Sequence, residues 1–259
     1  MVNKEIIYDQ DFFNTTHDHL SSARVILNIL FKHYNPESIV DVGCGSGSWL
    51  KVAGEMGVNS LTGIDGKWLK KDMLISNNFE LITHELETII PVLPAYDLAI
   101  SLEVAEHLPE SRAESFIRDL CKLSKVVLFS ASIPNQGGDN HINEQWQSYW
   151  YGLFRENNYL GFDIIRHQVW NDEQVKSWYK QNCLIYVHKD FIEIFNLVDN
   201  SKYPIDIVHK DIYSLNPDKF KYLQIISSSP RTFNLWQGLT IFLLCIVFIL
   251  LFLLMINYH

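Results

Sequence analysis

The chain has 259 residues, 47% of them hydrophobic, which is enough to bury the core of one α/β domain with smaller appended segments. Its formal net charge is −9 and no basic run exceeds two residues, so the electrostatic footprint of a nucleic-acid-binding protein is absent. The four cysteines, at positions 44, 121, 183 and 245, show no metal-binding spacing, which indicates free thiols in a reducing compartment.

The first predicted element is a helix within residues 11–34, where apolar residues recur on one face at helical spacing before Pro36 ends it. His17 and His19 stand near its start. At a helix start we expect solvated histidine side chains rather than substrate contacts. Residues 1–36 are therefore predicted to form an N-terminal helical cap.

A short apolar strand at residues 38–42 leads into a turn with glycine at every second position: Gly43, Gly45 and Gly47. Glycine allows positive φ and leaves room for a ligand to approach the main chain. The following helix begins with unpaired N–H groups and the positive end of its dipole. A dinucleotide-binding turn would instead need G-x-G-x-x-G.

With Asp41 in front, this D-x-G-x-G-x-G pattern resembles motif I of the class I S-adenosylmethionine-dependent methyltransferases. The resemblance implies that the turn binds S-adenosylmethionine (SAM) through Asp41, Cys44 and the three glycines. A glycine-rich turn without a ligand is the alternative. The residues that follow the next strands bear on this choice.

Residues 60–65 read as a second strand that ends in an acid, Asp65. Asp65 lies 22 residues after Gly43, close to the spacing at which such an acid reaches ribose hydroxyls. We therefore predict that its carboxylate binds the ribose of SAM, with a helix N-cap as the alternative role.

A third strand at residues 79–82 is followed by Glu85 and Leu86. The resemblance implies that Glu85 accepts from the adenine amino group and that the Leu86 N–H faces a ring nitrogen, although aspartate is more usual there than glutamate. Leu102, at the end of a fourth strand over residues 96–102, completes the predicted cofactor site.

With a fifth strand at 124–131, the strands and helices alternate throughout, which predicts a parallel sheet with helices on both faces. Residues 160–169 and 183–188 look like the last two strands, around a helix near 175–179. The predicted fold is the Rossmann-like class I methyltransferase fold over residues 37–189. Its seven-stranded sheet is mostly parallel with an antiparallel last strand.

The candidate catalytic residues follow the fourth and fifth strands. Glu103, Glu106 and His107 form E-x-x-E-H, and His141 lies in a polar loop after the fifth strand. Because the carboxyl ends of parallel strands share one edge of the sheet, these side chains are expected to converge there. His107 and His141 are candidate bases for a hydroxyl acceptor, with Glu106 beside them.

The same four side chains are a candidate site for Mg²⁺, Mn²⁺ or Zn²⁺. The arrangement resembles metal-dependent small-RNA 2′-O-methyltransferases and quinone-biosynthesis O-methyltransferases, in which an ion orients the acceptor hydroxyl. The alternative needs no metal: Glu106 caps the following helix, and the histidines bind substrate or act as bases.

The C-terminal part is predicted to hold a loosely packed extension at 190–234 and a transmembrane helix at 235–257. Residues 239–256 are eighteen uncharged residues, long enough to span a bilayer, and Trp236 and Tyr258 stand at the borders where interfacial aromatics belong. Basic residues precede the span, so the positive-inside bias predicts a single-pass anchor with a cytoplasmic catalytic domain.

Together these features predict a SAM-dependent methyltransferase that acts on a small-molecule hydroxyl or on a glycan- or lipid-linked one at the membrane surface. Residues 133–182 look like a bacterial branch of small-molecule methyltransferases often associated with glycan or secondary-metabolite genes. One alternative is a catalytically degenerate scaffold of the same fold. The other, a metal-dependent RNA 2′-O-methyltransferase, is disfavoured by the acidic charge.

Overall fold

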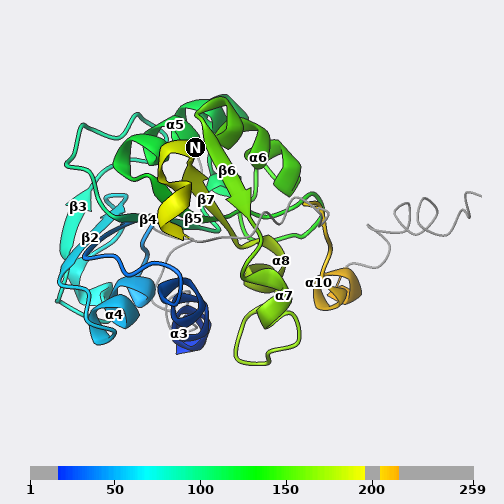
Figure 1. Ribbon diagram of the computed structural model, residues 1–259, viewed down its shortest axis with the longest axis horizontal. Coiled ribbons are helices and arrows are strands. Elements are labelled where there is room, and N and C mark those ends of the chain that lie inside the picture. The colour runs from blue at the N-terminus through cyan, green and yellow to red at the C-terminus, as the bar shows by residue number, and fades with distance from the viewer. Residues whose placement is uncertain (1–16, 196–204, 216–259) are drawn as a thin grey trace, which may run out of the picture. The chain divides into compact units, whose positions relative to one another are not determined.

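The computed structural model describes residues 17–195 and 205–215, and within them the strands form one sheet of seven (Figure 1). The order across the sheet is β3-β2-β1-β4-β5-β7-β6. The strands are β1 (Ser38–Val42), β2 (Ser60–Asp65), β3 (Glu80–Thr83), β4 (Leu98–Leu102), β5 (Val126–Ser130), β6 (Tyr159–Phe162) and β7 (Leu184–His188).

α-Helices separate β1 from β2, β4 from β5 and β5 from β6, as predicted. The prediction of a helix after every strand is wrong between β2 and β3, where there is only a 3-10 turn, and between β3 and β4, where the described chain has no helix. The α-helices are α3 (His17–Phe31), α4 (Ser48–Glu55), α5 (Ala113–Leu123), α6 (Gln147–Glu156), α7 (Arg166–Val169), α8 (Ser177–Asn182), α9 (Ile192–Phe195) and α10 (Lys210–Leu215). Short 3-10 turns are η1 (Lys71–Met73), η2 (Ala105–His107), η3 (Glu110–Arg112) and η4 (Lys189–Phe191).

The pairing of the strands confirms the predicted sheet. β1 to β5 run parallel to one another, whereas β7 is antiparallel to both β5 and β6. From β1 the chain continues to β2 and β3 on one side of β1, and then crosses to β4 on its other side. In open α/β sheets a ligand binds at such a switch point, beyond the carboxyl ends of the strands.

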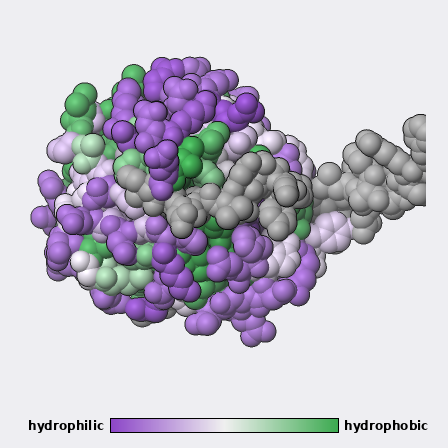
Figure 2. All heavy atoms as spheres, in the orientation of Figure 1, coloured by the Kyte–Doolittle hydropathy of each residue, from purple (hydrophilic) through white to green (hydrophobic). Residues whose placement is uncertain are grey.

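Two apolar layers lie on the two faces of the sheet. Residues of α3, α4 and α8 pack with side chains from one face, and residues of α5 and α6 pack with the other (Figure 1). In α5 the apolar stripe of Phe116, Ile117 and Leu120 is fully buried, as its helical spacing predicts. Figure 2 shows that hydrophilic side chains cover much of the visible surface outside this core.

The predicted sixth strand over 160–169 is only partly right. β6 ends at Phe162, and the rest of that stretch turns into the short helix α7. Asp163 Oδ1 accepts from the Arg166 N–H at 3.3 Å, and its Oδ2 pairs with the Arg166 guanidinium at 2.8 Å. These contacts stabilise a turn where the apolar pattern alone suggested continued strand.

The prediction of a loosely packed extension at 190–234 is wrong for residues 205–215. His209 and Ile212 in this segment are buried, and both backbone and side-chain groups of the segment make hydrogen bonds to the domain. The remainder, 196–204 and 216–234, lies outside the described residues.

The predicted transmembrane helix at 235–257 also lies outside the described residues. Among the helices of 17–195 and 205–215, none has the length and apolar character needed to cross a membrane.

Candidate active site

A cavity of about 390 Å³ opens beyond the carboxyl ends of β1, β4 and β5. Its walls come from the turns after these three strands and from the ends of α3 and α8. The lining residues are His19, Gly43, Cys44, Gly45, Ser46, Ser48, Trp49, Leu102, Glu103, Glu106, His107, Gln136, Gly137, Gly138, Asp139, His141, Trp178 and Tyr179. Among these described lining residues none is lysine or arginine.

The glycine turn after β1 has the backbone that its sequence predicts. Gly43, Gly45 and Gly47 have φ of 81°, 51° and 83°, a region that favours glycine. A side chain at Gly43 would also meet Val104, because a Cβ there would lie 2.4 Å from a valine methyl carbon. Gly43 and Gly45, with Cys44 between them, line the cavity, whereas Gly47, the N-cap residue of α4, is not among the lining residues.

Asp65 holds this turn from the neighbouring strand. One carboxylate oxygen accepts from the Gly45 N–H at 2.8 Å and the other accepts from the Gly66 N–H at 2.7 Å. Asp65 is buried and lies outside the cavity lining. The structure therefore shows it shaping the turn, and its contact with ribose stays a prediction.

Asp41, one strand over, is buried with its Oδ2 lacking a hydrogen-bond partner among the described residues. Burial, together with the nearby charge of Asp65, raises the pKa of the Asp41 carboxyl well above its usual range. The neutral form is therefore favoured, and like Asp65 it does not line the cavity.

Glu85 and Leu86, predicted to contact adenine, also lie outside the cavity lining. Glu85 Oε1 accepts from the Lys67 N–H at 3.2 Å, and the Leu86 carbonyl accepts from Arg112 Nε at 3.1 Å. The indole of Trp68 lies against Gly66, within 2.6 Å of where a Cβ on that glycine would be. Leu102, in contrast, lines the cavity at the end of β4.

Glu103 follows directly and has an unusual φ of 55° for a residue other than glycine. Its Oε2 accepts from Gln136 Nε2 at 3.1 Å and its Oε1 accepts from Asn182 Nδ2 at 3.2 Å. A backbone in this region is strained, so the surrounding contacts hold Glu103 at the cavity wall.

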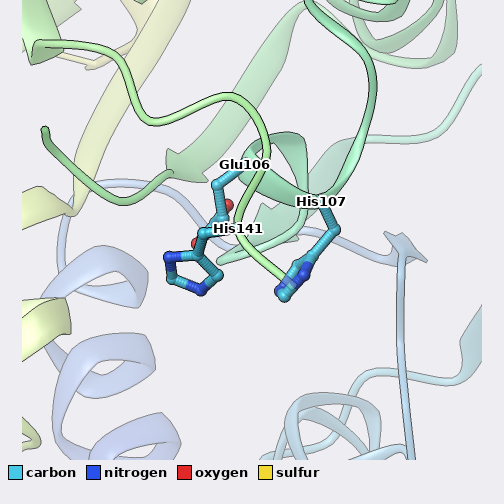
Figure 3. Close-up of side chains that lie close together, drawn as sticks. All are labelled: Glu106, His107 and His141. Carbon is cyan, nitrogen blue, oxygen red and sulfur yellow. The ribbon is translucent and has the colours of Figure 1, made fainter. Parts of the chain in front are cut away.

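Glu106, His107 and His141 come together as predicted from their strands. One ligand atom from each lies within 4.8 Å of the others, and Figure 3 shows the three side chains gathered from the turn after β4 and the loop after β5. The imidazole centroids are 4.9 Å apart with the rings nearly perpendicular. Glu103, the fourth predicted metal ligand, is not part of this group because its oxygens bind the amides of Gln136 and Asn182.

Glu106 is fully buried, and its side chain does not cap a helix. Its Oε1 lies 2.8 Å from Ser132 Oγ, while its Oε2 has no partner among the described residues. Burial first, and then the charge of Glu103, raise the pKa of Glu106 well above its usual range. A neutral carboxyl at this position carries one O–H donor.

Each histidine presents the same nitrogen to a protein oxygen. His141 Nδ1 lies 3.1 Å from Glu144 Oε1, and His107 Nδ1 lies 3.3 Å from the Asn140 carbonyl. An oxygen acceptor calls for a proton on Nδ1, which leaves Nε2 as the basic nitrogen of the neutral ring. Glu144 also accepts from two loop N–H groups, of Asn135 at 2.7 Å and Gly137 at 2.9 Å.

The expectation of a solvated His19 is wrong. His19 lines the cavity, and its Nδ1 lies 2.9 Å from the hydroxyl of Tyr179 on α8. The side chain of His17 is outside the described part of the structure. Tyr179 and Glu144 were not predicted as site residues. The polar residues around them, in the segments "WYKQN" and "HINEQW", were the only feature of the sequence that could have indicated their role.

Comparison with known proteins agrees with this geometry. The sequence model of a family described as a methyltransferase domain matches residues 16–189, well over half of the chain. The chain belongs to this methyltransferase family. It is therefore an enzyme of the SAM-dependent methyltransferase class, on the Rossmann-like fold described above. No curated protein matches the chain at a significant level.

Solved structures share the fold at low sequence identity. The magnesium protoporphyrin IX methyltransferase of Synechocystis PCC 6803 with bound S-adenosylhomocysteine (SAH) has a TM-score of 0.50 and 16% identity, over 66% of this chain and 84% of that one. A chain of the Haloferax volcanii complex between the Trm112 methyltransferase activator and a methyltransferase has a TM-score of 0.52 and 10% identity, over 71% and 96%. An O-methyltransferase family protein of Burkholderia thailandensis has a TM-score of 0.51 and 12% identity, over 68% of this chain and 57% of that one.

Proposed function

We propose that the enzyme transfers the methyl group of SAM to a hydroxyl of a small molecule or of a glycan- or lipid-linked acceptor at a membrane surface. One observation carries the chemical part of this proposal. A single cavity is lined by the glycine turn on one side and by Glu106, His107 and His141 on the other. Binding groups for a cofactor and candidate bases therefore face the same space.

The glycine-turn side of the cavity suits the methionine half of SAM. Positive φ at Gly43 and Gly45 lets a ligand approach the main chain, and the first residues of α4 present unpaired N–H groups. SAM is cationic at its sulfonium, and Glu103 supplies a carboxylate to the same cavity. For the adenosine half we retain Asp65, Glu85 and Leu86 as predicted contacts.

When bound, SAM supplies an electrophilic methyl group, so the protein's task is alignment and proton removal. We assign His141 Nε2 as the base that takes the hydroxyl proton as the acceptor oxygen bonds to the methyl carbon; the carbon–sulfur bond breaks in the same displacement, and SAH leaves with the electron pair of that bond. Glu144 holds the opposite nitrogen of that ring. His107 is the second imidazole beside the acceptor. A neutral Glu106 can donate a hydrogen bond to the acceptor.

A divalent ion is the rival account of the same three side chains. Glu106, His107 and His141 each offer one ligand atom within 4.8 Å of the others, so they could hold a divalent ion such as Mg²⁺ or Mn²⁺, and a bound ion would lower the pKa of the acceptor hydroxyl. Under this account EDTA abolishes transfer and Mg²⁺ or Mn²⁺ restores it. Full activity in EDTA, together with loss of activity in His141→Ala, favours the metal-free base.

The membrane setting rests on the sequence. The uncharged stretch at 239–256 supports a single-pass anchor, and the basic residues before it support a cytoplasmic catalytic domain. The acidic net charge and the lack of lysine and arginine among the described cavity residues support a non-nucleic-acid acceptor.

The test combines cofactor binding with labelled methyl transfer. Calorimetry with SAM and SAH is expected to show binding; a protein that binds neither would be the scaffold alternative. Incubation with methyl-labelled SAM is expected to label a glycan or lipid fraction of membranes, and His141→Ala is expected to remove the label. Label that appears only in added RNA would favour the RNA alternative.

A further inference from the structure

Behind the cavity, the amide side chains of Gln136, Gln181 and Asn182 form a buried network that ends on Glu103. Gln136 and Asn182 each donate to one oxygen of Glu103, at 3.1 Å and 3.2 Å. Gln181 Nε2 in turn donates to Gln136 Oε1 at 2.9 Å and to Asn182 Oδ1 at 3.0 Å. Gln181 is one of several groups that fix the direction of these links: the Ile133 N–H also donates to Gln136 Oε1 at 3.3 Å, and Ser132 Oγ also donates to Glu103 Oε2 at 3.1 Å.

The group that orients Gln181 comes from outside the matched methyltransferase domain. Residues 205–215, here called the strap, include α10, which packs against α8 and lies next to it in Figure 1. The strap also makes hydrogen bonds to the first turns of α6 and α7. The His209 N–H of the strap donates to Gln181 Oε1 at 2.8 Å. This bond turns the Gln181 carbonyl toward the strap and its NH₂ group toward Gln136.

The His209 backbone is itself fixed by its side chain. The imidazole is fully buried, with its centroid 4.5 Å from the ring of Trp170. Its Nε2 lies 2.8 Å from the Trp170 carbonyl, and its Nδ1 accepts from the Asp211 N–H at 3.2 Å. Both ring nitrogens are therefore satisfied in one orientation of the residue.

The entry to the strap is bonded as well. Arg166 Nη1 donates to the Ile205 carbonyl at 2.7 Å, and Asp206 Oδ1 accepts from the Ser148 N–H at the start of α6 at 2.8 Å. These contacts tie the strap to the domain independently of His209.

We infer that the strap is a positioning element of the active site: the His209 N–H sets the Gln181 amide, which acts through Gln136 and Asn182 to hold Glu103 at the cavity wall. The inference rests on the proposed function, because it gives Glu103 the role of facing the cofactor's positive charge. The strained backbone of Glu103 supports it, since a residue in that conformation depends on its neighbours for its placement.

The test needs no acceptor, because two cofactor analogues report on Glu103. Sinefungin carries an amine-bearing carbon in place of the methylsulfonium, so its charge lies where the methyl group would be, whereas SAH has no charge there. In the full-length protein, His209→Leu removes both ring contacts and loosens the strap. We expect it to weaken sinefungin binding about tenfold, as for one lost charge-assisted contact, with SAH affinity unchanged.

A double-variant cycle separates positioning from general destabilisation. Glu103→Gln is expected to weaken sinefungin binding by a similar factor. Adding His209→Leu to Glu103→Gln is expected to reduce the affinity little further, because the two changes remove the same interaction. Lys210→Gln, on the exposed face of the strap, is the matched control and should change neither affinity. If His209→Leu fails to fold, Asp206→Ala loosens the entry to the strap and is measured in the same way.

Unchanged sinefungin affinity in the strap variants, no effect of Glu103→Gln, or fully additive losses would each overturn the inference while SAH binding remains. Absence of SAH binding by the wild-type protein would instead count against the proposed function itself.

Discussion

The carboxyl of Asp41 is buried within the sheet, where its ionised form is unfavourable. Its pKa is raised above the usual value of 3.8 by burial and by Asp65, so between 3.8 and the raised value the folded chain binds more protons than the unfolded one. The contribution of Asp41 to the free energy of unfolding is then greatest below pH 3.8 and declines as pH rises through this window. Asp41→Asn, which keeps the shape without the titration, is expected to flatten that decline by up to about 1.4 kcal/mol per pH unit.

Urea unfolding at pH 5, 6 and 7 checks this, with the exposed acid Glu156→Gln as the control. Parallel stability curves for wild type and Asp41→Asn would show that the carboxyl titrates normally.

Glu144 has a defined effect on the proposed base. It accepts from His141 Nδ1 and from two loop N–H groups, so it fixes both the ring and the loop that carries the ring. Glu144→Gln offers an oxygen but no charge, and we expect methyl transfer to fall roughly tenfold to a hundredfold, within the range of general base catalysis. SAH affinity should be unchanged, because the glycine turn is not involved.

Single-turnover rates with labelled SAM measure this, and Glu110→Gln at an exposed position of η3 provides a charge-matched control. A rate equal to that of wild type would remove His141 from the role of base.

The turn between β1 and α4 is the element that the proposed function makes responsible for cofactor binding. Gly43→Ala combines the strain of a φ of 81° with a Cβ only 2.4 Å from Val104, so the turn must move. Gly57→Ala shares the strain, at a φ of 98°, but its Cβ would meet nothing within 4 Å. Both changes should cost about 1 kcal/mol through backbone strain, and only Gly43→Ala should also weaken SAH binding, by at least about tenfold.

Calorimetry with SAH and urea unfolding of both variants separates the two effects. Equal SAH affinities for Gly43→Ala and Gly57→Ala would mean that the cavity does not bind the cofactor through this turn.

For the molecule as a whole, the proposal of a membrane anchor predicts where the protein is found in a cell. Full-length protein should sediment with membranes and need detergent for release. Leu244→Lys with Phe248→Lys places two charges in the 239–256 stretch, each costing about 2.5–3.5 kcal/mol at the centre of a span, and should move the protein to the soluble fraction. Leu244→Ile with Phe248→Leu is the apolar control; a soluble wild-type protein would refute the anchor.

Much of the fold follows from local sequence. Alternating apolar strands and amphipathic helices predict the parallel sheet, because short right-handed connections leave few other topologies, and the structure has that sheet. The meeting of Glu106, His107 and His141 was predictable for the same reason, since the ends of β4 and β5 are adjacent.

The remaining features depend on packing between distant parts of the chain. Nothing local to Asp65 shows that its carboxylate holds the Gly45 N–H, and nothing near His209 points to Gln181. The raised pKa of Glu106 likewise follows from complete burial beside Glu103. Sequence alone thus determined the elements and the edge of the sheet that carries the site. Tertiary contacts decided which polar groups lose water and which partners they gain, because burial is a property of the assembled molecule.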